Sequence, residues 1–304
     1  MKLVPVDSDE HWKSLRAKHV GGSEIAALFD RSPYFTRFML WHDKAGKVPL
    51  PEPDNDRVWW GKKLEPIIAE RVSAQMRWQL EACKVYCVAE TTEGMGCTVD
   101  RFVIDHERGP GVVEIKDVDW LEHRRLWTET HAPAHIELQL QHQLAVTGFE
   151  WGAIACFVKG SSNDVLIYER KPEPAVMAEI VRAVTDFWRS VHAGEAPEPF
   201  GAVEESETLR VLYPRPEPEK FVDLTGDAEA FELARQLAWA KTQYEFHAGI
   251  ADHARLKLLA KIGDAHRVII PGINFRRTKS GAIKKCERIE GVTPVFAGPD
   301  FSFI

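Results

Sequence analysis

The order of strand-like and helical patterns between residues 84 and 193 limits the fold of this chain more than any other feature. Three strand-like runs are followed by an amphipathic helical pattern, two further strand-like runs and a second helical pattern. The strand-like runs cover 84–89, 94–104, 111–117, 150–158 and 164–169, and the helical patterns cover 134–147 and 173–193. Antiparallel strands followed by a helix and another strand indicate an α/β sandwich around a mixed sheet. We therefore expect a mixed central sheet flanked by helices.

Further helices are predicted before this sheet. Residues 8–29 predict two short helices, and Ser23 is placed to cap the second of them. A longer helix is expected from about residue 58 to residue 76, because Leu64, Ile68 and Val72 recur every four positions.

A proline-rich segment, YPRPEPEK at 213–220, marks a boundary in the chain. Beyond it, 227–262 predicts a long helix with a candidate break near Gly249, and three short strand-like runs follow. The expected organisation is a domain at 1–212, a linker at 213–220, and a helical and basic β extension at 221–304.

Charge is divided unevenly along the chain. The net charge of −7 is unfavourable for binding nucleic acid, because phosphates attract cations. Between Arg255 and Arg288, however, ten basic residues stand against two acidic ones, so this stretch carries +8 and the rest of the chain −15. Such asymmetry suggests a basic module attached to an acidic body. A DNA-binding stretch and a solvated basic hairpin are both consistent with it.

The sequence contains no sign of a membrane or secreted protein. No apolar run approaches the roughly 18 residues that a spanning helix needs, and the first residues lack the apolar core of a signal peptide. The five cysteines form no pairable framework, so we expect free thiols. These features predict a cytoplasmic protein without a membrane partner.

Two carboxylates and one lysine are placed to converge on the predicted sheet. Glu114 and Lys116 lie on the same face of their strand, because side chains alternate with a period of two. Asp100 lies beside them if the preceding strand pairs with this one as a hairpin. The two carboxylates would repel each other, and a divalent cation such as Mg²⁺, which prefers hard oxygen ligands, would relieve that repulsion.

This set of side chains fits the hydrolysis of a phosphodiester. A divalent cation polarises a phosphoryl oxygen and activates water, while Lys116 can orient that water and offset the developing charge. Glu-x-Lys pairs are common on protein surfaces, however, and a solvated strand face explains the motif better when it is taken alone.

Neighbouring helices supply further polar candidates. Glu65 lies one residue from the apolar stripe of its helix, so that helix could direct it towards the site. Gln139 and Gln143 form an i, i+4 row at the border of a buried face, and buried amides need partners that a site would supply. The alternatives are a surface glutamate at 65 and a polar helix edge at Gln141 and Gln143.

Four sequence blocks carry a resemblance to a known family. In chain order they are GGSEIAALFDRSPY, WGKKLEP, TVD with VVEIK, and QLQHQLAVTG, and they span roughly residues 12–158. Their order and spacing resemble the YqaJ-like viral recombinases and lambda-type phage exonucleases of the PD-(D/E)xK nuclease superfamily. The motif departs at Val99, which replaces the proline of the motif name but is not a ligand position.

The resemblance implies a fold, an activity and partners. It implies a PD-(D/E)xK core and Mg²⁺-dependent 5′-to-3′ digestion of one strand at the ends of linear double-stranded DNA, with Mn²⁺ expected to substitute. The product would carry 3′ single-stranded tails for phage-type recombination in a bacterial host. A single-strand annealing protein is the expected partner. A homo-oligomer, a trimer in the lambda type, is also implied.

The resemblance also implies roles for individual residues. Asp100 and Glu114 would bind the metal together with the carbonyl oxygen of Ile115. Glu65 would bind or position a metal from its helix. Lys116 would be the catalytic lysine, and Gln139 the amide of the site.

Further roles concern the DNA itself. Arg16 and Ser23 match the positions that bind the 5′-phosphate in the lambda type. Val58 and Trp59 lie where an apolar wedge separates the strands, although most tryptophans of this chain are better explained as core or interface residues.

Two other functions remain open at the level of sequence. The same core could belong to a structure- or site-specific endonuclease, because the fold sets the chemistry and peripheral parts set the substrate. A catalytically silent DNA-binding or assembly protein is the other alternative, and the complete set of carboxylates and lysine argues against it.

Overall fold

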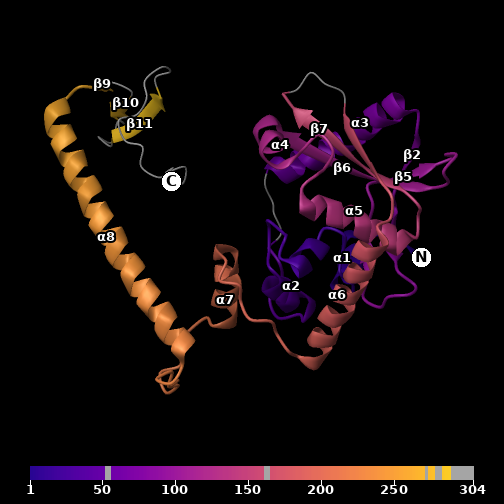
Figure 1. The fold of residues 1–304 in the computed structure, drawn as a ribbon, viewed down its shortest axis with the longest axis horizontal. Coiled ribbons are helices and arrows are strands. Elements are labelled where there is room, and N and C mark those ends of the chain that lie inside the picture. Colours follow the sequence, from indigo (N-terminus) through magenta and orange to yellow (C-terminus); the bar gives the residue numbers. More distant parts are fainter. Residues whose placement is uncertain (52–55, 161–164, 271–272, 278–282, 289–304) are drawn as a thin grey trace. The chain divides into compact units, whose positions relative to one another are not determined.

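A computed structural model describes residues 1–51, 56–160, 165–270, 273–277 and 283–288, with side chains described up to residue 266. The chain divides into two compact units, Met1–Pro216 and Glu217–Ile304 (Figure 1). We describe each unit by itself.

A five-stranded mixed sheet forms the centre of the first unit (Figure 1). Its order is β2 (Gln79–Ala82), β5 (Arg101–Ile104), β6 (Gly111–Asp119), β7 (Gly152–Lys159) and β8 (Leu166–Arg170). Only β6 and β7 run parallel, and the long connection between them allows this pairing. The expected mixed sheet is therefore confirmed.

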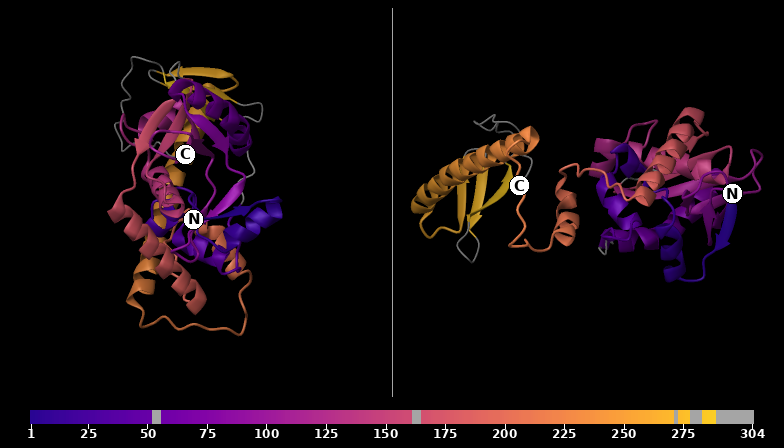
Figure 2. Two further views of the ribbon diagram at one scale, coloured as in Figure 1. Left: turned by 90° about the vertical axis from the view of Figure 1, so that its right-hand side faces the viewer. Right: turned by 90° about the horizontal axis from the view of Figure 1, so that it is seen from below.

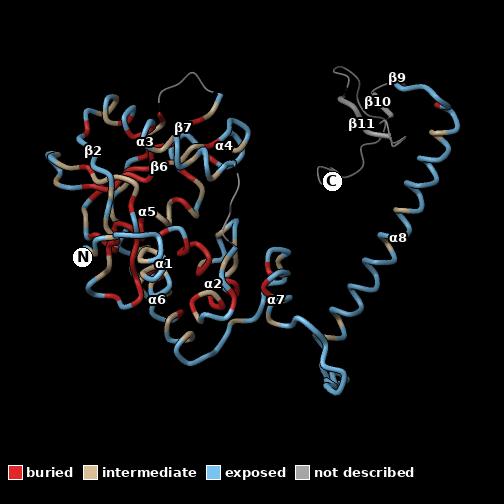
Figure 3. The backbone as a smooth tube through the Cα atoms, turned by 180° about the vertical axis from the view of Figure 1, so that it is seen from behind, coloured by how far each residue is buried: buried red, intermediate tan, exposed pale blue. Residues whose placement is uncertain are grey.

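Helices cover both faces of this sheet (Figure 2). Alternate residues of the strands face opposite sides, so that Val112 packs in the larger core and Val113 in the smaller one. The larger core lies under α5 (Ala134–Thr147) and α6 (Pro174–Ala193), and the smaller core lies under α3 (Asp56–Met76). Buried segments follow these elements through the unit (Figure 3).

The remaining elements of the first unit surround this sandwich. A second, antiparallel sheet has the order β1 (Lys2–Pro5), β3 (Val85–Val88) and β4 (Gly96–Cys97). The other helices are α1 (Asp9–Ala17), α2 (Arg37–Lys44), α4 (Trp120–Leu126) and α7 (Ser206–Leu212), with 3-10 turns at Ile25–Phe29 and Val203–Glu205.

Three local expectations were wrong. The run 94–104 is not one strand, because β4 belongs to the second sheet and β5 to the central one. Ser23 does not cap the turn that begins at Ile25; Glu24 occupies that position, and Ser23 is exposed. Gly249 does not break the helix of the second unit.

The second unit contains a helix and a small sheet. The helix α8 (Ala228–Ile262) is continuous over 35 residues. An antiparallel sheet follows, in the order β11 (Ile283–Arg288), β10 (Ile273–Arg277) and β9 (Arg267–Ile270), as the three strand-like runs predicted. Within the described residues, no helix is both long and apolar enough to cross a bilayer.

Candidate active site

The adjacent strands β5 and β6 bring the two candidate carboxylates together. Arg101 pairs with Val113 across the hairpin, which places the preceding Asp100 beside Glu114. The Asp100 carboxylate accepts a hydrogen bond from the backbone N–H of Ile115 at 2.7 Å. This bond fixes the orientation of Asp100 relative to the Glu-x-Lys motif.

Lys116 lies on the same face of β6 as Glu114. Its ammonium donates to Glu114 Oε1 at 2.6 Å and to Gln139 Oε1 at 3.2 Å. Burial by itself would lower the pKa of Lys116, but Glu114 and Asp100 outweigh it and raise that pKa above its ordinary value. Lys116 therefore remains a cation at neutral pH.

The helix α5 supplies two amides because its apolar residues pack on the sheet beside them. Besides Gln139, Gln143 donates to Glu114 Oε2 at 2.7 Å and to the carbonyl oxygen of Thr98 at 3.3 Å. Gln143 is completely buried. Gln141 is buried as well and bonds the backbone near α6. The interpretation of Gln141 and Gln143 as a polar helix edge was therefore wrong.

A cavity of about 80 Å³ lies at this point. Its lining includes Asp100, Glu114 and Gln139 together with Arg16 and Ser23 from the N-terminal segment. Residues more than 80 positions apart in the sequence thus share one small polar space.

The two carboxylates repel each other at the cavity. Loss of water around the carboxyl group, and then the charge of Glu114, raise the pKa of Asp100 well above its ordinary value. This electrostatic conflict is the arrangement that a divalent cation would relieve.

The donor set fits Mg²⁺. Among the residues that the structure describes, no three His, Cys, Asp or Glu side chains gather as a metal-binding group. Mg²⁺ commonly uses one or two carboxylates and fills its other positions with water and phosphate oxygens. Asp100 and Glu114 satisfy that pattern, and the Ile115 carbonyl is the backbone candidate.

Glu65 approaches from α3, on the opposite face of the sheet from α5. Its Oε1 accepts a hydrogen bond from Arg101 Nη1 at 2.5 Å, and its charge contributes to the raised pKa of Asp100. Glu65 is therefore close to the carboxylates, and Arg101 is a cation near the site that the sequence analysis did not consider.

Arg16 and its surroundings contain two residues that the sequence analysis missed. The guanidinium of Arg16 pairs with Glu24, which also pairs with Lys44 Nζ at 2.9 Å. No periodic pattern could identify this trio, because α1, the 3-10 turn and α2 meet only in the folded chain.

Trp59 and Trp60 stand together at the start of α3. Both are about half exposed, and their rings meet edge to face with centroids 4.9 Å apart. Val58 is partly buried. The tandem makes Trp60 a second aromatic candidate for contact with bases.

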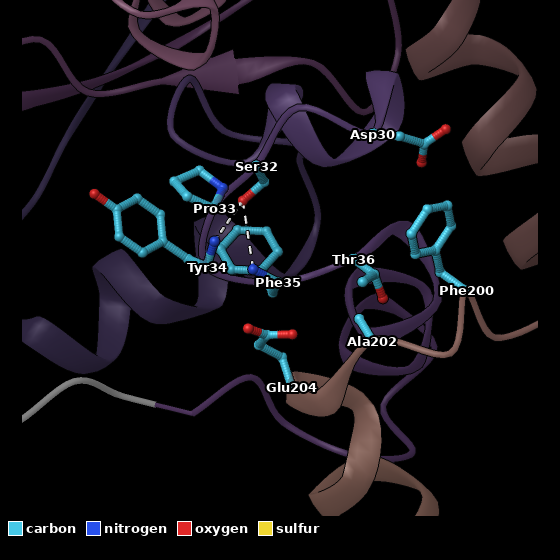
Figure 4. Close-up of a pocket in the computed structure, with 9 residues that line it drawn as sticks. All are labelled: Asp30, Ser32, Pro33, Tyr34, Phe35, Thr36, Phe200, Ala202 and Glu204. Carbon is cyan, nitrogen blue, oxygen red and sulfur yellow. Dashed lines mark hydrogen bonds between the residues drawn. The ribbon is translucent and has the colours of Figure 1, made fainter. Parts of the chain in front are cut away.

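A larger cavity, of about 170 Å³, is lined by a different set of residues (Figure 4). Tyr34, Phe35 and Phe200 contribute to its lining, and Ser32 accepts backbone hydrogen bonds at its edge. None of the catalytic candidates lines it. Its size alone gives it no chemical role.

Comparisons with known proteins identify a matching domain family and a similar bacterial protein. Residues 11–150 match the YqaJ-like viral recombinase domain. The uncharacterized protein YqaJ of Bacillus subtilis is 26% identical over 220 residues, which cover 72% of this chain and 68% of that protein.

Solved structures share the fold. The alkaline exonuclease LHK-Exo from Laribacter hongkongensis is 20% identical, with a TM-score of 0.53 over 61% of this chain and 94% of that one. LHK-Exo in complex with dAMP is 19% identical, with a TM-score of 0.53 over 67% of this chain and 96% of that one. Residues 11–150 therefore resemble a YqaJ-like viral recombinase domain, and the chain shares the fold of the alkaline exonuclease structures.

Proposed function

We propose that this protein is an Mg²⁺-dependent 5′-to-3′ exonuclease that acts on the ends of linear double-stranded DNA and leaves 3′ single-stranded tails. The observation that supports this most is the shared cavity. It joins Asp100, Glu114 and Gln139 to Arg16, so that a cation site and a cationic anchor for a strand end lie together.

The chain's own residues have distinct tasks in this reaction. Asp100 and Glu114 would hold the cation, which supplies Lewis-acid polarisation of the scissile phosphodiester when bound. Lys116, held by Glu114 and Gln139, orients the attacking water and offsets negative charge that develops on the phosphate. Gln143 holds Glu114 in place through its buried amide.

The end of the DNA strand would be recognised at the other side of the cavity. The guanidinium of Arg16 offers a fork of donors that matches phosphate oxygens, and Ser23 offers a hydroxyl. A 5′-phosphate held there leaves the first phosphodiester bonds near Asp100 and Glu114. The structure of LHK-Exo contains dAMP, and we propose that the site of this chain also accommodates a nucleoside monophosphate.

End-labelled linear duplex tests this function. We expect Mg²⁺-dependent release of 5′-terminal nucleotides, with closed circular duplex resistant. Cleavage of closed circles at a rate similar to that of linear DNA would instead identify an endonuclease. Binding of both substrates without cleavage in saturating Mg²⁺ would identify a DNA-binding protein.

The identity of the metal should separate binding from cleavage. Mg²⁺ and Mn²⁺ are expected to support digestion, whereas Ca²⁺ should support DNA binding but not cleavage, because it is larger and a poorer Lewis acid. Filter binding and digestion in each metal measure the two properties. Activity that survives EDTA, or efficient digestion in Ca²⁺, would contradict the assignment of Asp100 and Glu114.

The C-terminal extension is proposed to hold duplex DNA without regard to its end. The basic stretch between Arg255 and Arg288 motivates this, although its side chains beyond residue 266 lie outside the described part. A chain that ends at Pro216 should show a flatter dependence of DNA affinity on salt, because each lost phosphate contact lowers the slope by about 0.9. An unchanged slope would assign the extension to protein contacts instead.

A single-strand annealing protein and a homo-oligomeric state are proposed on the family resemblance alone. Sedimentation of the purified protein, with and without such a partner, tests both.

A further inference from the structure

Glu24 is a buried carboxylate between two cations, and the reaction as described so far does not use it. Its side chain is 2% exposed. One oxygen accepts a hydrogen bond from Arg16 Nη2, and the other lies 2.9 Å from Lys44 Nζ and accepts from the backbone N–H of Gly21 at 2.8 Å. Three segments of the chain therefore meet at one carboxyl group.

Burial of this carboxylate costs folding free energy. A buried carboxylate is destabilising unless cations and hydrogen bonds replace its lost hydration. Burial alone would raise the pKa of Glu24, but Lys44 and Arg16 outweigh it and lower that pKa, so the carboxylate stays ionised. Well-packed hydrophobic residues in place of the whole charged cluster would often stabilise a fold equally well. Stability alone therefore does not explain the cluster, and a fixed position for Arg16 is what Glu24 specifically provides.

We propose that Glu24 is a positioning residue that orients Arg16, and the loop carrying Ser23, towards a terminal 5′-phosphate. This inference rests on the proposed function, since it assumes that Arg16 contacts the end of the strand. Arg16 lines the cavity and is partly exposed, with its guanidinium carbon 4.7 Å from the centre of the Trp12 ring. Glu24 and Trp12 together restrict a side chain that would otherwise sample many rotamers.

The same carboxylate fixes the second phosphate candidate. By accepting from Gly21, Glu24 holds the Gly21–Ser23 turn. Gly22 of that turn lies beside Gln139, since an added Cβ would be in van der Waals contact with its Cγ at 3.4 Å. The turn therefore lies between Glu24 and the helix that carries the catalytic amide.

Lys44 adds a second cation beside Glu24. Its ammonium pairs with Glu24 and lies 3.6 Å from Asp43 Oδ2, so that two cations face two carboxylates in this cluster. The buried ammonium of Lys44 also donates to the carbonyl oxygen of Arg16 at 2.9 Å, which anchors the end of α1. An anion would thus meet a guanidinium held in place by Glu24 and by the anchored end of α1.

The ratio of digestion rates on 5′-phosphate and 5′-hydroxyl ends tests this role in the full-length protein with saturating Mg²⁺. We expect Arg16→Ala to lower this ratio on the order of tenfold, as for a misplaced substrate. Glu24→Gln should lower it to a similar extent, and the double variant no further. Loss of folded protein lowers both rates together, so it cancels in the ratio.

A matched control is available in the same unit. Glu205 is also completely buried and accepts hydrogen bonds from Thr36 Oγ1 at 2.5 Å and from the N–H groups of Phe200 and Gly201 at 3.0 and 2.8 Å. Glu205→Gln should leave the ratio unchanged, whatever it does to stability.

A second variant covers the case in which Glu24→Gln does not fold. Glu24→Asp keeps the charge but is one methylene shorter, so it should fold and still lose part of the end preference. A wild-type ratio in the folded Glu24 variants, with a reduced ratio in Arg16→Ala, would overturn the positioning role. If Arg16→Ala keeps the wild-type ratio of digestion rates, Arg16 does not recognise the 5′-phosphate and this inference is overturned. The assignment of the protein as a nuclease would then remain intact.

Discussion

Replacing Lys116 by alanine should lower the rate of DNA cleavage by several powers of ten while leaving the fold and much of the DNA binding intact. The ammonium is placed by Glu114 and Gln139 at the edge of the carboxylate cluster, and its apolar neighbours on β6, rather than Lys116 itself, pack in the core beneath α3. Loss of one contact to charge that develops in a transition state typically costs about 3–4 kcal/mol. Glu114→Gln should have an effect of similar size, because it removes a ligand charge.

Single-turnover digestion of end-labelled duplex in saturating Mg²⁺ measures this effect. Lys159→Ala is a suitable control, because Lys159 on the neighbouring strand β7 also pairs with a carboxylate at 2.9 Å, but that carboxylate is Asp117, on the opposite face of β6 from Glu114. The control should retain activity. Turnover near the wild-type rate in Lys116→Ala or Glu114→Gln would remove the basis of the active-site assignment.

Local patterns predicted the centre of the fold well. The period of two along β6 correctly separated Glu114 and Lys116 from Val113 and Ile115, which pack in the smaller core. The helix that carries Gln139 was predicted with the bounds that it has in the structure. Both patterns arise because one face of the strand or helix is buried, and the spacing of apolar residues close in the sequence shows which face that is.

Long-range pairing was not predictable in the same way. The run 94–104 was predicted as one strand, yet Cys97 pairs with Cys87 in one sheet and Arg101 with Val113 in another. The choice of partner strand depends on residues far away in the sequence. The unexpected β2 edge strand, which pairs with β5, has the same origin.

The polar residues of the candidate site were likewise predicted only in part. The resemblance implied Asp100, Glu114 and Lys116 as site residues. In the structure these residues lie close together, and hydrogen bonds orient Asp100 and Lys116. Gln143 and Glu24 were missed or undervalued, because a buried polar side chain looks like a surface one until its partner is known. Their roles depend on contacts between separate elements.

Asp100→Asn should abolish metal-dependent cleavage and raise the melting temperature of the metal-free protein. The carboxylate of Asp100 is destabilised by burial and by Glu114, whereas an asparagine there is neutral and its amide oxygen can still accept from the Ile115 N–H. A stabilising single substitution is commonly worth about 0.5–2 kcal/mol. In a domain of this size that corresponds to roughly 2–4 °C for each kcal/mol.

The pH dependence of this gain has a defined sign. Because folding raises the pKa of Asp100, the folded chain holds that proton more tightly than the unfolded chain, and the stability this provides is lost as pH rises above the ordinary value of 3.8. The difference in melting temperature between Asp100→Asn and wild type in EDTA should therefore be small below about pH 4 and grow towards neutral pH. Added Mg²⁺ should stabilise only the wild type, since it neutralises the same repulsion.

Asp117→Asn provides the contrasting control, because Asp117 is paired with Lys159 and its loss should lower rather than raise the melting temperature. An Asp100→Asn protein that is less stable than wild type in EDTA at neutral pH would show that Asp100 stabilises the fold. The carboxylate pair would then be a structural feature rather than a site kept under electrostatic strain for a cation. A gain in stability combined with loss of cleavage is the result expected of a functional carboxylate, whose charge is maintained for the metal and the phosphate at the expense of the fold.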